Sequence, residues 1–125
     1  MKTIIAAGLI VAGIIHLLPL SGVLGAERLA TLYGIPFTDA NLAILMRHRA
    51  VLFGLLGALL VAAAFKPSLQ PIALIAGLIS VVSFLWLASA YDKINPAIER
   101  IVIADWIALG CLLVSTAAYF AAKRS

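Results

Sequence analysis

The chain has 125 residues, 65% of them hydrophobic and only 11% charged, with a mean hydropathy of +1.19 and a formal net charge of +4. A soluble domain is roughly 45–50% apolar, so this composition excludes an ordinary soluble protein and indicates an integral membrane protein. The one cysteine, Cys111, excludes an internal disulfide and a paired-cysteine redox motif. We therefore predict one all-α domain over residues 1–125, a bundle of four transmembrane helices.

Four apolar segments each approach the ~20 residues that a helix needs to cross ~30 Å of hydrocarbon. Their ends carry helix signals: Thr38 is a capping residue before the second segment, Pro67 follows it, and Pro71 lies in the first turn of the third. Asn95 and Pro96 form a cap and a first-position proline before the fourth. We predict helices over about residues 3–20, 39–65, 71–90 and 96–122.

The first apolar segment follows Lys2 and so resembles a signal peptide, but no small-x-small cleavage site follows it cleanly. We expect it to be retained as a helix. Between the first two membrane segments, Ala26–Tyr33 has the mixed polarity of an amphipathic helix. A short interfacial helix is predicted there.

Basic residues are distributed unevenly between the two ends of the predicted bundle. Because the four helices alternate in direction, both termini share one end with the connection at Lys66, and that end carries Lys2, Lys66, Lys123 and Arg124 without an acidic residue. The positive-inside tendency favours placing both termini in the cytoplasm. These flanking cations account for the pI of 9.7, so no nucleic-acid partner is predicted.

Ionisable residues of three helices fall in one layer of the predicted bundle. At ~1.5 Å per residue, His48 and Asp105 lie ~25 Å from the termini end of their helices and His16 lies ~20 Å from it. The third helix can add aromatic or hydroxyl groups to this layer, from Ser83, Trp86 or Tyr91. A polar layer in the outer half of the membrane is therefore predicted.

Helical facing suggests which of these charges point inward. Arg47 shares a face with small residues such as Gly54 and Gly57, which would let another helix approach closely, whereas Arg49 lies ~200° away and is expected to reach the lipid headgroups. Asp105 lies on the more polar face of its helix, which it shares with Ala108, Leu112, Ser115 or Thr116, and Tyr119. Opposite charges at one depth in lipid should pair, so we predict an ion pair between Arg47 and Asp105.

Structural roles are alternatives for the same residues. Arginines at a membrane boundary commonly anchor to headgroups, and Asp105 could be a structural partner without chemistry. His16 precedes Pro19 and could simply bond a backbone carbonyl that the proline leaves free.

The stretch LPLSGVLGAERLATLYGIPF, followed by a helix with RHRAVLFGLLGALL, resembles the DoxX-like group of small bacterial four-helix membrane proteins. The group's Pro, Tyr-Gly, Arg and Gly features correspond here to Pro19, Tyr33, Gly34, Arg47, Gly54 and Gly57. The resemblance implies the four-helix fold, a place in a bacterial inner membrane, and little chemistry. Similar short sequences are sometimes labelled phosphopantetheine adenylyltransferase, a soluble α/β enzyme with an HxGH-type motif. Here His16 and His48 stand alone, and no Gly-rich phosphate loop is present.

Three functions remain open. The favoured one is binding of an amphiphile such as a lipid or quinone in the polar layer, or an accessory role beside a second copy or a partner membrane protein. Its candidate ligand-binding residues are His16, Arg47, His48, Trp86, Tyr91 and Asp105.

The second is a membrane enzyme using His16 or His48 with Asp105 in acid-base chemistry. The third is a haem protein with both histidines as axial ligands, although their ~5 Å difference in depth disfavours it. No cofactor is predicted, and two histidines with one aspartate are too few to predict a metal site.

Overall fold

The computed structural model describes residues 1–124, which contain helices and no strand. The elements in chain order are α1 (Lys2–Leu17), the 3-10 helix η1 (Leu18–Leu24), α2 (Ala26–Tyr33), α3 (Ala40–Phe65), the 3-10 turn η2 (Pro67–Leu69), α4 (Gln70–Ser89) and α5 (Pro96–Arg124). The predicted all-α class is confirmed, as is the short helix between the first two long ones.

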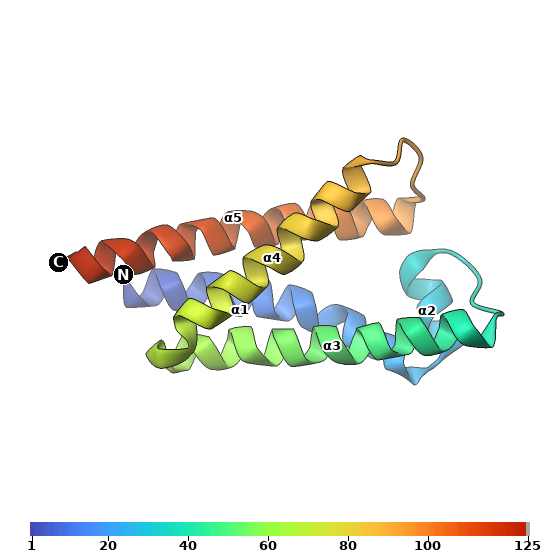
Figure 1. The fold of residues 1–125 in the computed structure, drawn as a ribbon, viewed down its shortest axis with the longest axis horizontal. Coiled ribbons are helices and arrows are strands. Elements are labelled where there is room, and N and C mark those ends of the chain that lie inside the picture. The colour runs from blue at the N-terminus through green and yellow to red at the C-terminus, as the bar shows by residue number, and fades with distance from the viewer. Residues whose placement is uncertain (125) are drawn as a thin grey trace.

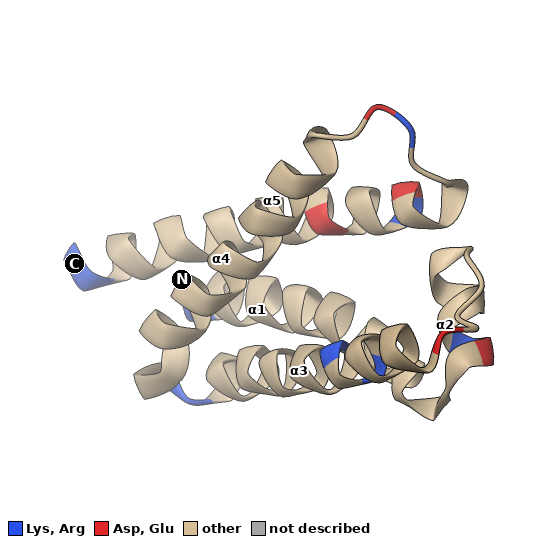
Figure 2. Ribbon diagram, turned by 45° about the vertical axis from the view of Figure 1, so that its right-hand side comes forward, with Lys and Arg blue, Asp and Glu red and all other residues tan. Residues whose placement is uncertain are grey.

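Four segments are long and apolar enough to cross a membrane: Lys2–Leu24, Ala40–Phe65, Pro67–Ser89 and Pro96–Arg124. The long helices alternate in direction, so both termini and η2 lie at one end, the termini end (Figure 1). At the opposite end, the α2 end, lie α2 and the connection between α4 and α5. Figure 2 shows basic residues without acidic ones at the termini end and both signs towards the α2 end. The fold is that of a small multi-pass membrane protein.

Side-chain caps mark the starts of α3 and α5. The Asn95 side chain accepts a hydrogen bond from the Ile98 amide at 2.8 Å, as its position before a proline predicts. At α3, however, the predicted cap Thr38 is wrong: Asp39 is the N-cap and accepts from the Asn41 amide at 2.9 Å. The chain enters α3 one residue later than expected, and the aspartate carboxylate takes the capping position.

Close packing in the bundle centres on α1, which runs along both α3 and α5. Glycines make the α1–α3 contact possible: a Cβ atom on Gly57 would lie 2.9 Å from the Gly13 carbonyl oxygen, and one on Gly13 would lie 3.1 Å from that of Gly57. α4 crosses the bundle obliquely and diverges from α3 towards the α2 end (Figure 1). This divergence opens the side of the bundle on which the candidate site lies.

A second, small apolar cluster fastens α2 to the end of the bundle. Its buried members are Leu29, Tyr33 and Phe37, with Met46 of α3 and Ile98 of α5 packed against them. The Asn95 amide also donates to the Tyr33 carbonyl oxygen at 2.8 Å. These contacts place the last turn of α2 between α3 and the start of α5.

Candidate functional site

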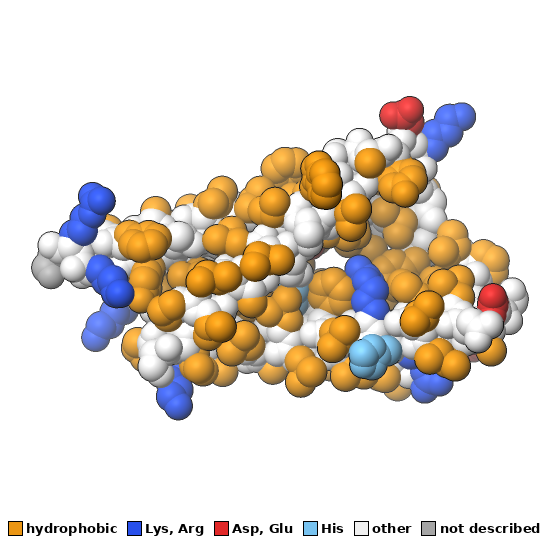
Figure 3. Space-filling view, in the orientation of Figure 1, with side chains coloured by type: hydrophobic (Ala, Val, Ile, Leu, Met, Phe, Trp, Pro, Cys, Tyr) orange, Lys and Arg blue, Asp and Glu red, His pale blue; other side chains and the backbone are white. Residues whose placement is uncertain are grey.

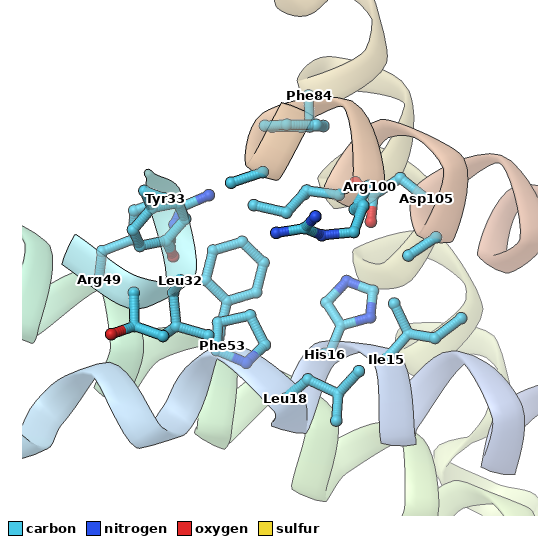
Figure 4. Close-up of a pocket in the computed structure, with 15 residues that line it drawn as sticks. Ile15, His16, Leu18, Leu32, Tyr33, Arg49, Phe53, Phe84, Arg100 and Asp105 are labelled. Atoms are coloured by element: carbon cyan, nitrogen blue, oxygen red, sulfur yellow. Dashed lines mark hydrogen bonds between the residues drawn. The ribbon is translucent and has the colours of Figure 1, made fainter. Parts of the chain in front are cut away.

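A cavity of about 290 Å³ lies near the α2 end, where side chains of α1, α2, α3, α4 and α5 converge (Figure 4). Most of its wall is apolar, including Ile15, Phe53 and Phe84. The polar and charged side chains in the wall are His16, Thr31, Tyr33, Arg49, Arg100 and Asp105. A mainly apolar cavity with a few converging polar groups is the usual form of a small-molecule site.

Arg49 is held in this cavity by two aromatic rings. Its Nη1 donates to the Tyr33 hydroxyl at 2.5 Å, and its Cζ lies 4.4 Å from the Phe53 ring centroid and 5.4 Å from that of Tyr33. Cation–π contacts of this kind strengthen where water is excluded. The hydrogen bond uses one of the five N–H donors of the guanidinium, so the side chain is fixed while it keeps donors for another partner.

Arg47 does not occupy the predicted inward position. It is exposed, its Nε donates to the Val23 carbonyl oxygen in η1 at 2.9 Å, and it is not part of the cavity wall. The predicted facing of the two arginines is therefore wrong. The small residues around Gly57 do face inward, but they make the close contact with α1. Arg49 lies on the side of α3 that faces the cavity. Arg47 lies on another side of α3, where it bonds η1.

His16 is buried, at 2% exposure, and both ring nitrogens have partners. Nδ1 lies 2.8 Å from the Ala12 carbonyl oxygen and Nε2 lies 3.0 Å from the Ser80 hydroxyl. Because a carbonyl only accepts, Nδ1 carries the proton, and in the neutral ring Nε2 accepts from Ser80. His16 thus bonds a backbone carbonyl, but that of Ala12 and not that of Ile15, which lies four residues before Pro19 and loses its amide partner to the proline. The ring also ties α1 to α4.

Asp105 lies on the α5 wall of the cavity and is half-buried, with Ala108, Leu112 and Ser115 buried on the turns that follow. α5 therefore turns the predicted face towards the inside of the bundle. Arg49 lies in the wall of the same cavity, whereas Arg47 does not. The predicted ion pair between Arg47 and Asp105 is therefore wrong, because Arg47 lies outside the cavity and Arg49 is the arginine of α3 that faces the same space as Asp105.

Three other predicted candidates lie outside the cavity. His48 is exposed on α3, and Tyr91, in the connection after α4, is 71% exposed. Trp86 is 74% exposed and borders a separate shallow apolar groove on α4. His16 and His48 are therefore not brought together as two axial ligands would be, and residues 1–124 contain no cluster of three potential metal ligands.

Arg100 and Tyr33 are cavity residues that the sequence analysis did not select. Arg100 lies near the start of α5, where a charge is commonly solvated, and the placement of α5 beside α2 brings it to the cavity. A local signal existed for Arg49, because Phe53 follows it at i+4, a spacing at which helical side chains meet. Tyr33 ends an amphipathic helix whose docking site cannot be read from its own sequence.

Comparison of the chain with protein-family models, with curated proteins and with solved structures found no match. The site presents the Arg49 and Arg100 guanidinium groups and the Asp105 carboxylate around an apolar space. The His16 imidazole also lines it, but both ring nitrogens are already hydrogen-bonded within the protein.

Proposed function

We propose that this chain is a small membrane protein that binds an amphiphile of the lipid or quinone class in the cavity beside α2. The observation that carries the proposal is the convergence of Arg49, Arg100 and Asp105 from two helices on a mainly apolar space. Charged groups within a membrane segment are expensive and commonly mark a binding site or pathway. A ligand with a polar head and an apolar body matches this division of the wall.

The proposal includes an orientation. The acid-free cationic end favours both termini in the cytoplasm of a bacterial cell, which would place the cavity in the outer half of the inner membrane. A reporter fused after Ser125 and one inserted within Ala26–Tyr33 would test it: the first should be active only as a cytoplasmic reporter and the second only as a periplasmic one. The reverse pattern would place the cavity in the inner half. The four-helix fold is the one that the DoxX-like resemblance implies, and membership of that group is part of this proposal.

The enzyme alternative has less support from the site. A general base must be free to take a proton from substrate, whereas both ring nitrogens of His16 are hydrogen-bonded within the protein. An axial haem role for His16 would likewise require it to give up Ser80, and His48 is not in the cavity to serve as the second ligand.

Filling the cavity provides a direct test of binding. Ala104 lines the cavity on α5, and Ala117 is exposed on the same helix, so Ala104→Phe and Ala117→Phe add the same side chain inside and outside the site. Each full-length variant would be purified from membranes, extracted with organic solvent and analysed by mass spectrometry, with an absorbance scan for haem.

We expect the wild-type chain and Ala117→Phe to retain one amphiphile at near-stoichiometric amounts, and Ala104→Phe to lose most of it. Equal retention in both variants would show that the bound molecules are annular lipid and would refute binding in the cavity. A Soret band in the wild-type protein would favour the haem alternative.

A further inference from the structure

We infer that the cavity selects amphiphiles whose headgroup is a singly charged oxyanion, a carboxylate or a phosphodiester, held between Arg49 and Arg100. This inference rests on the proposed function and narrows it, because neutral quinones and fatty alcohols become poor ligands.

The charge balance of the wall gives the sign. Arg49 and Arg100 each carry a permanent positive charge, Asp105 is the one acidic residue in the wall, and His16 contributes hydrogen bonds as a neutral ring. The wall therefore has one positive charge in excess. The Arg49 guanidinium is only partly exposed, in a mainly apolar wall where an uncompensated charge is costly, and a ligand with one negative charge balances the excess.

The free hydrogen-bonding capacity gives the chemistry. Within residues 1–124, neither the Arg100 guanidinium nor the Asp105 carboxylate has a hydrogen bond to protein, and Arg49 has one, to Tyr33. Guanidinium groups bind carboxylate and phosphate oxygens through paired, charge-assisted hydrogen bonds. A quinone carbonyl could accept one such bond but would leave the excess charge in place.

The depth and opening of the cavity match a headgroup that arrives from the bilayer. Arg49 lies ~24 Å along α3 from its Phe65 end, close to the far limit of a ~30 Å hydrocarbon layer. Figure 3 shows a hollow on the apolar flank between α3 and the diverging end of α4 and α5, with a basic side chain inside it. α2 supplies cavity wall at the water-facing end, through Thr31, Leu32 and Tyr33. A lipid headgroup can therefore reach the arginines sideways while its chain stays in the membrane.

The test compares ligands that differ only in the head. Binding of radiolabelled palmitate and of hexadecanol, which has the same chain with a neutral head, would be measured on the full-length chain in detergent at about pH 8, where a free carboxylate is ionised. Dioleoylphosphatidylglycerol, with one phosphodiester charge, and zwitterionic dioleoylphosphatidylcholine would serve as competitors. We expect palmitate to bind at least about 10-fold more tightly than hexadecanol, the size expected for one charge-assisted hydrogen bond.

Variants of the charged wall sharpen the test. Arg49→Gln and Arg100→Gln should each weaken palmitate binding by about 10-fold and leave hexadecanol binding unchanged. Asp105→Asn should tighten palmitate binding, because it removes the one negative charge in the wall. Arg47→Gln is the matched control, an arginine on the same helix outside the cavity, and should change neither ligand. Arg100 is exposed, so its variant should fold even if Arg49→Gln does not.

The outcomes separate this inference from the proposed function. Displacement by phosphatidylglycerol alone would identify a phospholipid phosphate, and preference for palmitate alone would identify a carboxylate. Hexadecanol binding as tightly as palmitate, or an Asp105→Asn variant that binds palmitate less tightly, would overturn the inference and leave amphiphile binding intact. No saturable binding of palmitate or hexadecanol, together with equal amphiphile retention by the wild-type chain and Ala104→Phe, would contradict the proposed function itself.

Discussion

The two halves of the bundle bury their side chains in different ways. Towards the termini, Leu9, Leu60 and Leu112 are fully buried, and the Ser115 hydroxyl donates to the Ile5 carbonyl oxygen at 3.1 Å within the α1–α5 contact. Towards α2, α4 diverges and the space is a cavity whose wall includes three charged residues. Close packing leaves no room for a ligand at one end, and the separation of helices at the other allows charges to be placed where a ligand can meet them.

The largest expected effect is on the closely packed half of the bundle, towards the termini. Gly57→Val would place a Cβ atom 2.9 Å from the Gly13 carbonyl oxygen, which is backbone and cannot move aside cheaply. We expect a loss of about 3 kcal/mol or more in the free energy of unfolding and a low folded yield. Gly110→Val is the control, because a Cβ atom there meets nothing within 4 Å. Thermal unfolding in detergent and size-exclusion chromatography would measure both; similar losses in the two variants would show that α1 and α3 do not approach as described.

The electrostatic coupling in the cavity half should be smaller. A double-mutant cycle of Arg49→Gln and Asp105→Asn should show a coupling energy of about 1 kcal/mol, since both charges line the same mainly apolar cavity. The same cycle with Arg47→Gln should be additive within about 0.5 kcal/mol. Coupling of Asp105 to Arg47 and not to Arg49 would support the sequence prediction that Arg47 points into the bundle.

Ser80 tests the tie between α1 and α4 at the edge of the cavity. Ser80→Ala removes the donor to His16 Nε2 and leaves a buried ring nitrogen without a partner, at a cost of about 1 kcal/mol. Ser83→Ala provides the control, because the Ser83 hydroxyl is exposed and donates only to the Ser80 carbonyl oxygen of its own helix. Denaturant unfolding monitored by tryptophan fluorescence would compare them, and equal stability would mean that His16 does not depend on α4.

The smallest expected effect lies at the entrance to α3. Asp39→Ala should destabilise the protein by about 0.5 kcal/mol, because the exposed cap loses its bond to the Asn41 amide. Thr38→Ala should cost less than half of that. Thermal unfolding of the two variants would decide between them, and a greater loss at Thr38 would favour the boundary expected from the sequence.

The sequence was sufficient for the fold because the determining signals are local. Apolar length specifies the membrane helices, and residues such as Asn95 and Pro71 mark where they begin. The placement of His16 and Asp105 in one layer, within ~5 Å of depth, also follows from helix rise alone, and both side chains line the cavity.

Only the tertiary structure decided which charges meet. Arg47 and Arg49 are two residues apart on one helix, and the choice between them depends on how α3 rotates against its neighbours. That rotation is set by the Gly13–Gly57 contact with α1 and by the hydrogen bond from Arg49 to Tyr33 of α2. Local patterns fix the length and depth of a helix, but its rotation is a property of the contacts between helices, so the cavity wall became visible only when the helices were assembled.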